Sequence, residues 1–202
     1  MKVELHCHTA RYSQCAVGTP HQMMHALIEA GYQAVYITEH DRVWDDWELG
    51  DLQREFGRIR IFPGVELSIG PDFKQHLLVL GTNDAAYLAL KEPGEIIAQA
   101  RRQGHLTVLA HPFRWAGGDE MLRGADLPDA IENLTCNQED AASQDAQKAA
   151  LRLGLPVVNA SDAHSVDMIG RYWIETDRDL GKADDIAAII ADRAYRNCVR
   201  KK

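Results

Sequence analysis

Short apolar segments alternate with amphipathic segments along the chain, and this alternation predicts strands separated by helices. The apolar segments expected to form strands are residues 2–6, 34–38, 60–66, 75–81, 106–110, 130–132, 155–160 and 172–175. Helices are expected over residues 20–30, 93–103, 141–153 and 183–194, and glycine follows the first three of them. Repeated apolar strands separated by helices indicate an α/β protein with a mainly parallel sheet covered by helices.

No linker, repeat or low-complexity stretch divides the sequence, so a single domain over residues 1–202 is expected. The Gly-Pro-Asp sequence at residues 70–72 predicts a turn between two of the strands. Apolar residues make up 46% of the chain, which is enough for one sizeable core. The longest apolar runs fall far short of the roughly 20 residues that span a bilayer, and no signal segment opens the sequence. We therefore expect no membrane association and a cytoplasmic location.

The balance of charge disfavours extensive binding to nucleic acid. The chain has 30 acidic and 22 basic residues and a net charge of −8, whereas neutralising phosphates along a nucleic acid needs a basic face. The one basic run, residues 193–202, is expected to be a solvated helix end. The four cysteines have no CxxC spacing, which favours reduced thiols.

Histidine is abundant, and its positions point to chemistry at one end of the sheet. Parallel α/β folds place their functional groups at the C-terminal ends of strands. Eight imidazole and carboxylate groups lie at or near predicted strand ends and are expected to converge: His6, His8, His40, Glu66, His76, His111, Asp162 and His164. Neutral histidines with carboxylates and no thiolate run suit Zn²⁺, Mn²⁺ or Fe²⁺.

The His6-Cys7-His8 sequence has a direct geometric meaning. Side chains alternate along a strand with a period of two, so the two imidazoles project to one side and the thiol projects to the other. Cys7 is therefore not expected to be a ligand.

Several motifs occur in an order and spacing that resemble one known family. They are LHCHT at 5–9, ITEHD at 37–41, GVE at 64–66, His76, AHPFR at 110–114 and SDAH at 161–164. Together they resemble the PHP (polymerase and histidinol phosphatase) family of metal-dependent phosphoesterases over nearly the whole chain. The resemblance implies a distorted (β/α)7 barrel, which suits a chain that is short for an eight-unit barrel.

The resemblance also implies two or three divalent metal ions, Zn, Mn or Fe, with Glu66 shared by the first two. The first ion would take His6, His8, Glu66 and Asp162, the second would add His76 and His111 to Glu66, and the third would take His40 and His164. Many members supply an Asp or His soon after the HxHT segment, but residues 10–16 contain neither. Gln14, Cys15 or His21 could substitute, although a weak or absent third ion is the simplest hypothesis.

The activity implied is hydrolysis of a small phosphoester by a hydroxide that bridges two metal ions. His40, His164 or the third ion would assist the leaving group. Arg114 is expected to bind phosphate, and Arg11 and Arg171 are further candidates. The Trp-Asp-Asp-Trp segment at 44–47 is expected to be either a substrate-facing lid or a surface loop anchored by its two aromatic residues.

Two alternatives belong to other classes. Metal-dependent amidohydrolases also begin with HxH and end with a catalytic Asp, but their shared ligand is often a carboxylated Lys where this chain offers Glu66. A non-catalytic, metal-binding regulatory PHP module is the other alternative, which the complete set of expected ligands disfavours.

Overall fold

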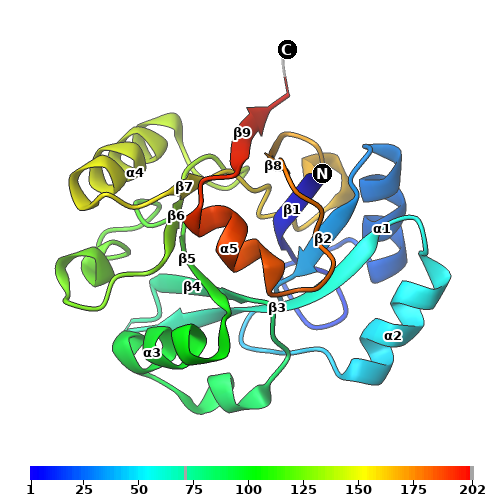
Figure 1. Cartoon of the computed structure of the whole chain (residues 1–202), viewed down its shortest axis with the longest axis horizontal. Coiled ribbons are helices and arrows are strands. Elements are labelled where there is room, and N and C mark those ends of the chain that lie inside the picture. Colours follow the sequence, from blue (N-terminus) through cyan, green and yellow to red (C-terminus); the bar gives the residue numbers. More distant parts are fainter. Residues whose placement is uncertain (71, 201–202) are drawn as a thin grey trace.

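The computed structural model describes residues 1–70 and 72–200, and one curved sheet of nine strands organises them (Figure 1). The strands are β1 (Lys2–Cys7), β2 (Ala34–Ile37), β3 (Arg60–Ile69), β4 (Gln75–Leu80), β5 (Leu106–Ala110), β6 (Ala130–Glu132), β7 (Val157–Val158), β8 (Tyr172–Thr176) and β9 (Tyr195–Val199). In spatial order the sheet runs β7-β6-β5-β4-β3-β2-β1-β8-β9. Strands β1 to β7 therefore form the continuous part of the sheet in reverse chain order, and β8 and β9 extend the sheet beyond β1.

The helices of the described residues lie around this sheet. The α-helices are α1 (Pro20–Glu29), α2 (Asp46–Glu55), α3 (Pro93–Gln103), α4 (Asp140–Leu153) and α5 (Asp185–Ala191), and the 3-10 helices are η1 (Ala85–Ala89), η2 (Glu120–Arg123) and η3 (Val166–Met168). In Figure 1, α1 and α2 flank one side of the molecule, α3 and α4 flank the other, and α5 lies between them. Within residues 1–70 and 72–200, no helix combines the length and apolar character needed to cross a membrane.

The sheet closes almost completely, because one edge of β1 pairs with two different segments. β8 pairs antiparallel with the start of β1, at Lys2 and Val3. At the other end of β1, His8 N donates to Ala163 O at 2.9 Å and Ala163 N donates to His6 O at 3.1 Å. These bonds attach the chain that follows β7 to β1. The α/β fold expected from the resemblance, a distorted (β/α)7 barrel, is confirmed as an α/β fold with a nearly closed, barrel-like sheet.

The expectation of a mainly parallel sheet is wrong, because only half of the strand pairs are parallel. β1–β2, β2–β3, β5–β6 and β6–β7 are parallel, whereas β3–β4, β4–β5, β1–β8 and β8–β9 are antiparallel. β3 ends at Ile69 and β4 begins at Gln75, and so short a connection cannot make the crossover that parallel neighbours need. The predicted turn at 70–72 fits this connection, although Pro71 lies outside the described residues.

The basic tail forms a strand, so the solvated helix end expected for residues 193–202 is wrong. α5 ends earlier than expected, because Arg193 adopts a left-handed backbone with a φ of 54° and turns the chain into β9. Asn197 Nδ2 then donates to Val157 O at 2.8 Å, so a β9 side chain binds the backbone of β7. Of the expected tail, residues 201–202 lie outside the described residues.

Residues 44–47, expected as a lid or a surface loop, instead lead into α2. Asp45 is the N-cap residue, and Glu48 completes a capping box by accepting a hydrogen bond from Asp45 N at 3.3 Å. The helix buries Leu49 and Leu52. The Asp-x-x-Glu spacing is the sequence signal for this helix start.

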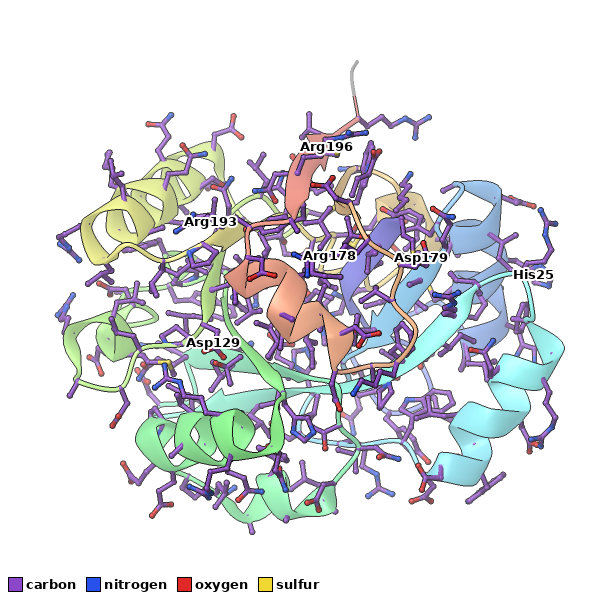
Figure 2. The ribbon with its side chains drawn as sticks, viewed as in Figure 1. His25, Asp129, Arg178, Asp179, Arg193 and Arg196 are labelled. Atoms are coloured by element: carbon purple, nitrogen blue, oxygen red, sulfur yellow. The ribbon has the colours of Figure 1, made fainter. Side chains whose placement is uncertain are left out.

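The barrel interior is apolar below the functional end of the sheet. It combines residues of β1, β2, β4 to β8 and α5, among them Val3, Leu5, Tyr36, Leu78, Leu80, Leu106, Val108, Val158, Ile174, Ile186, Ile189 and Ile190. α5 is the helix that packs into this interior, whereas the other α-helices cover the outside of the sheet. Figure 2 labels Arg178 near α5, and its Nη2 donates to Asp192 Oδ2 at 2.6 Å, at the C-terminal end of this helix. The interior core therefore supports the far end of the barrel, opposite the histidines.

Candidate metal centre

A bulge in β1 sets the direction of the first histidine. The pairing of β1 with β2 shifts register between Glu4 and Cys7, so β1 contains one extra residue there. Leu5 lies in the barrel interior, whereas Cys7 packs outside against the helices, on the side away from His6 and His8 as expected. An unbroken alternation would have put Leu5 and Cys7 on the same side. The extra residue allows His6 to point inward as well, although it directly follows Leu5. Bulges commonly redirect side chains next to functional sites.

The structure brings the eight expected side chains together, with the buried carboxylate of Glu66 at their centre. Five ring nitrogens surround it: His76 Nδ1 at 2.8 Å and His111 Nε2 at 3.1 Å from Oε1, and His40 Nδ1 at 2.9 Å, His8 Nε2 at 3.1 Å and His6 Nε2 at 3.2 Å from Oε2. Each carboxylate oxygen therefore faces its own set of imidazoles. His76 reaches the cluster because β4 is antiparallel, so the start of β4 lies at the same end as the C-termini of β1 and β3.

Asp162 closes the cluster from the chain that follows β7. Its Oδ1 lies 3.3 Å from the Nε2 atoms of both His6 and His8, and 3.6 Å from His164 Nδ1. Asp162 has a left-handed backbone with a φ of 49°, and His111 has a φ of 29°. Such strained conformations in non-glycine residues persist where the surrounding structure enforces them, and they cluster at functional sites.

The ligand atoms fall into three overlapping groups, each with its atoms within 4.8 Å of one another. The groups are His6, Glu66, His111 and Asp162; His40, Glu66 and His76; and His8, His40 and His164. The shared carboxylate of Glu66 matches the resemblance, whereas His8 and His111 fall into groups other than those it implied. The assignment of individual residues to individual ions stays a prediction.

The chemistry of this cluster fits divalent metal ions. Among the described residues, Glu66 Oε2, Asp162 Oδ1 and His111 Nδ1 are buried without a well-directed hydrogen bond, although ring nitrogens lie close to both carboxylate oxygens. His6 Nε2 also lies only 2.9 Å from His8 Nε2. Buried polar atoms that lack partners are costly, and a cation satisfies converging lone pairs directly.

The charged groups of the cluster shift one another's pKa values. Burial lowers the pKa of His6, but the carboxylates of Asp162 and Glu66 outweigh this effect and hold that pKa well above its usual range. Burial likewise raises the pKa of Glu66, yet His6 holds it well below its usual range. Burial, followed by the charge on His8, lowers the pKa of His164 to about 4. Ionised carboxylates and a neutral His164 are the protonation states that bind a cation.

Glu132, which the sequence analysis did not identify, supports two of the expected ligands. This buried residue ends β6, and its Oε1 lies 2.9 Å from His6 Nδ1. Its Oε2 accepts a hydrogen bond from His111 N at 2.9 Å. A carboxylate on the far nitrogen of a metal-binding imidazole fixes the orientation and tautomer of the ring. The sequence contains a signal for this role, because Glu132 is the last residue of the predicted strand 130–132, just as Glu66 is the last residue of the predicted strand 60–66.

Replacing Glu132 with glutamine is expected to weaken metal binding by about 10- to 100-fold, because a carboxylate that orients a ligand contributes on this scale. Isothermal titration of the chelated protein with Mn²⁺ or Zn²⁺ measures this affinity. The exposed Glu95→Gln on α3 is the matched control and should bind metal as the unsubstituted protein does. Equal affinities for the two variants would show that Glu132 does not orient His6.

A second buried carboxylate, Glu39, supports the opposite side of the cluster. It accepts hydrogen bonds from Thr9 N at 3.0 Å, Ser13 Oγ at 2.5 Å and Trp44 Nε1 at 3.1 Å. Ser13 Oγ in turn lies 3.1 Å from His8 Nδ1. Glu39 therefore holds the loop that follows β1 and acts on His8 through Ser13.

Of the three arginines considered for phosphate binding, Arg114 lies at the cluster. Its Nη1 is 3.7 Å from Asp162 Oδ2, and its guanidinium lies 4.5 Å from the centre of the Trp115 ring. Arg11 is bound to Glu48 of α2 instead. The role of Arg114 stays a prediction.

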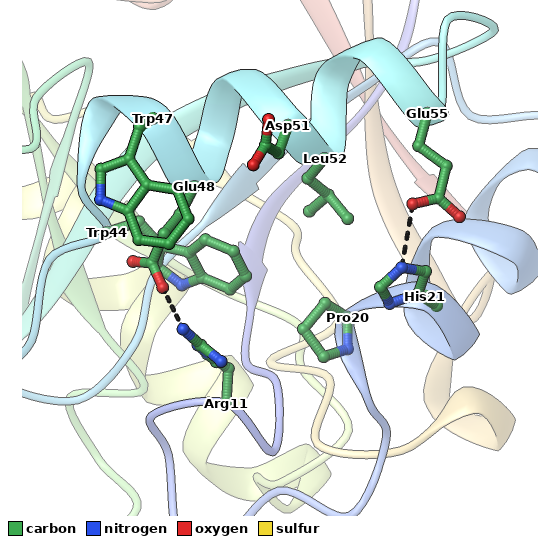
Figure 3. A pocket seen from close by; sticks show the side chains of 9 residues that line it. All are labelled: Arg11, Pro20, His21, Trp44, Trp47, Glu48, Asp51, Leu52 and Glu55. Carbon is green, nitrogen blue, oxygen red and sulfur yellow. Dashed lines mark hydrogen bonds and ion pairs between the residues drawn. The ribbon is translucent and has the colours of Figure 1, made fainter.

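A separate pocket of about 330 Å³ lies between α1 and α2 (Figure 3). Its lining residues are Arg11, Pro20, His21, Trp44, Trp47, Glu48, Asp51, Leu52 and Glu55. Figure 3 shows an ion pair at each end, Arg11 with Glu48 and His21 with Glu55, the second with an N···O distance of 3.0 Å. The two tryptophans of the 44–47 segment therefore line this pocket.

Two family models match the sequence. The PHP domain matches residues 4–111, which contain six of the eight clustered residues, and a PHP-associated family matches residues 141–195. No curated protein sequence matches the chain significantly.

Solved structures share the fold at low sequence identity. A two-domain protein from Bacteroides vulgatus, containing an inferred PHP-like metal-dependent phosphoesterase, aligns with a TM-score of 0.72 and 16% identity over 99% of this chain and 65% of its own. An inferred metal-dependent phosphoesterase from Bifidobacterium adolescentis gives 0.66 and 17% over 95% of this chain and 96% of its own. An amidohydrolase from Chromobacterium violaceum, with bound sulfate and no metal, aligns with a TM-score of 0.64 and 16% identity. This alignment covers 82% of this chain and 88% of the amidohydrolase. The chain thus spans about two thirds of the first protein's length.

Proposed function

Because this chain belongs to the PHP domain family, we propose that it is a metal-dependent hydrolase of small phosphoesters. The reaction adds water across the phosphoester, so the bond between phosphorus and the ester oxygen breaks and an alcohol and phosphate leave. The observation that carries the proposal is the carboxylate of Glu66, whose two oxygens each face a separate set of imidazoles. This arrangement suits a ligand shared by two metal ions.

The ions would be held by the three overlapping groups around Glu66, and we propose that two sites are filled tightly. Two divalent ions, when bound, lower the pKa of a water molecule and neutralise charge on the phosphoryl oxygens. The chain keeps Glu66 and Asp162 ionised for this purpose, since nearby imidazoles hold both pKa values below their usual ranges in spite of burial.

Residues at the open side of the cluster would handle the substrate. Arg114 places a positive charge beside Asp162, where it can pair with an oxygen of the phosphoryl group. His40 and His164 are the most exposed of the clustered imidazoles, with side chains 27% and 16% exposed. Because the departing alcohol leaves through the open side, His40 is placed to give its oxygen a proton. The low pKa of His164 suits a neutral metal ligand there rather than a proton donor.

A substrate panel separates this proposal from its alternatives. The chelated protein is reconstituted with Mn²⁺ or Zn²⁺, its metal is counted by mass spectrometry, and phosphoesters and amides are offered. We expect about two ions per chain and metal-dependent phosphate release, as the shared carboxylate suggests. Amide hydrolysis alone would identify an amidohydrolase, and bound metal without turnover would identify a regulatory module. Three tightly bound ions would contradict a weak third site.

A further inference from the structure

Several exposed apolar residues lie in segments that follow the strand ends bearing the histidines. The large apolar residues most exposed in the described part of the chain are Val17, Trp47, Phe73, Trp115, Leu151, Val166 and Val199. Val17, Phe73, Trp115 and Val166 lie in segments that follow the C-terminal ends of β1, β3, β5 and β7, which also bear histidines or Asp162, whereas Trp47 belongs to α2 and lines the separate pocket. Single exposed apolar residues are ordinary, but several around a polar cluster are typical of a ligand site.

Trp115 is the member of this set that packs against the metal cluster. The centre of its ring lies 5.4 Å from that of His76 and 5.5 Å from that of His111, and the rings meet at 62° and 82°. The residue is nevertheless 38% exposed. The indole therefore touches two expected metal ligands and also presents surface to the mouth of the site.

The loop that carries Trp115 is held firmly in place. Arg114 N donates to His111 O at 3.0 Å, and Gly118 N donates to Trp115 O at 3.1 Å. A Cβ atom at Gly118 would lie 2.6 Å from Pro112 O and 3.3 Å from a backbone oxygen of the β3–β4 turn, so the loop packs directly against that turn. The position of the indole is therefore set by backbone contacts as well as by the cluster.

The turn that packs against this loop also carries an exposed aromatic residue. Phe73 lies in the β3–β4 turn and is 63% exposed. It directly precedes Lys74, whose carbonyl oxygen is the turn atom that approaches Gly118. The turn that carries Phe73 therefore lies directly beside the loop that carries Trp115.

We infer that Trp115 is a specificity-determining residue that binds the leaving group of the substrate, and that the substrate is a phosphoester of an alcohol with a flat apolar ring. This inference rests on the proposed function. Arg114, the phosphate-binding candidate, lies on the face of the same indole and 3.7 Å from Asp162. A phosphoryl group held at Arg114 and the cluster therefore has its ester substituent beside Trp115. Aromatic side chains bind flat apolar rings by stacking or edge contacts.

The test compares benzyl phosphate with ethyl phosphate, because both release alcohols of similar reactivity and differ mainly in the ring. We expect the metal-loaded protein to prefer benzyl phosphate. In Trp115→Ala the ratio of kcat/KM for benzyl phosphate to kcat/KM for ethyl phosphate should fall about tenfold, mainly through a higher KM for benzyl phosphate, since this is the upper scale of one aromatic contact. Because the indole also packs against His76, His111 and Arg114, activity toward both esters is expected to fall, and the readout is therefore the ratio of the two kcat/KM values. Trp47→Ala is the matched control, because it removes an exposed tryptophan from the pocket between α1 and α2.

A binding experiment tests the preference for the ring without depending on turnover. Calorimetry with benzylphosphonate and ethylphosphonate, which are not hydrolysed, measures the same preference on the Mn²⁺-loaded protein. Trp115→Phe keeps a ring and should retain most of the preference, which covers the case in which the alanine variant does not fold. Phosphonates that bind without any preference for the ring, or a preference lost in Trp47→Ala instead, would overturn the inference while the proposed function stands. Ring preference in binding without hydrolysis of any phosphoester would show that Trp115 binds the ring, but it would contradict the proposed function and with it the role of Trp115 toward a leaving group.

Discussion

Replacing Glu66 with glutamine is expected to lower kcat/KM for a phosphoester by about 10³-fold or more, because one substitution affects the ligands of two metal ions at once. Each oxygen of Glu66 faces its own imidazoles, at distances of 2.8 to 3.2 Å. An amide offers one acceptor in place of two, and its NH₂ group places hydrogens where an ion would sit. The expected result is a folded protein that holds fewer ions and releases phosphate very slowly.

Two measurements check this expectation. Mass spectrometry counts metal per chain after reconstitution, and a phosphate-release assay gives kcat/KM at saturating Mn²⁺. The control is Glu55→Gln, which removes one negative charge at an exposed position of α2. If Glu66→Gln kept its metal and its activity, Glu66 would not be the shared ligand and the proposed mechanism would be wrong.

The convergence of the eight residues was predictable because it depends on topology more than on detail. His6 ends a predicted strand, and His8, His111 and Asp162 follow predicted strands, while the C-terminal ends of parallel strands meet at one end of a barrel. The convergence does not depend on the exact bounds of the predicted strands. β7 covers Val157–Val158 rather than residues 155–160, yet Asp162 still reaches the cluster.

Other features of the site depend on contacts that no local pattern contains. The bulge between Glu4 and Cys7 turns His6 inward, but the sequence of β1 reads as an ordinary alternation. Glu132 shows its role only beside His6 and His111, which are distant in the sequence. β9 is not predictable from its own residues, because its basic side chains favour solvent. In the structure, hydrogen bonding to β8 outweighs this preference. Tertiary pairing overrides local preference in such segments.

The stability of the site depends on the far end of the barrel, where α5 fills the interior. Ile186, Ile189 and Ile190 are buried there against residues from seven strands. α5 belongs to the segment that matches the PHP-associated family, whereas most of those strands belong to the segment that matches the PHP domain. The two matched segments therefore share one core, and the loss of α5 contacts should destabilise the metal site together with the rest of the fold.

Ile186→Ala is accordingly expected to lower the free energy of unfolding by about 3 kcal/mol, the usual cost of a cavity at a fully buried isoleucine. Urea denaturation of the chelated protein measures this change, because bound metal would add stability of its own. Ile186→Val removes one methylene group and should cost about 1 kcal/mol, and Leu151→Ala, at a position 86% exposed, should cost little. Since α5 and the strands share one core, fluorescence and circular dichroism should report a single transition for each variant. A separate early transition in Ile186→Ala would mean that α5 detaches alone and that the barrel holding the histidines is stable without it.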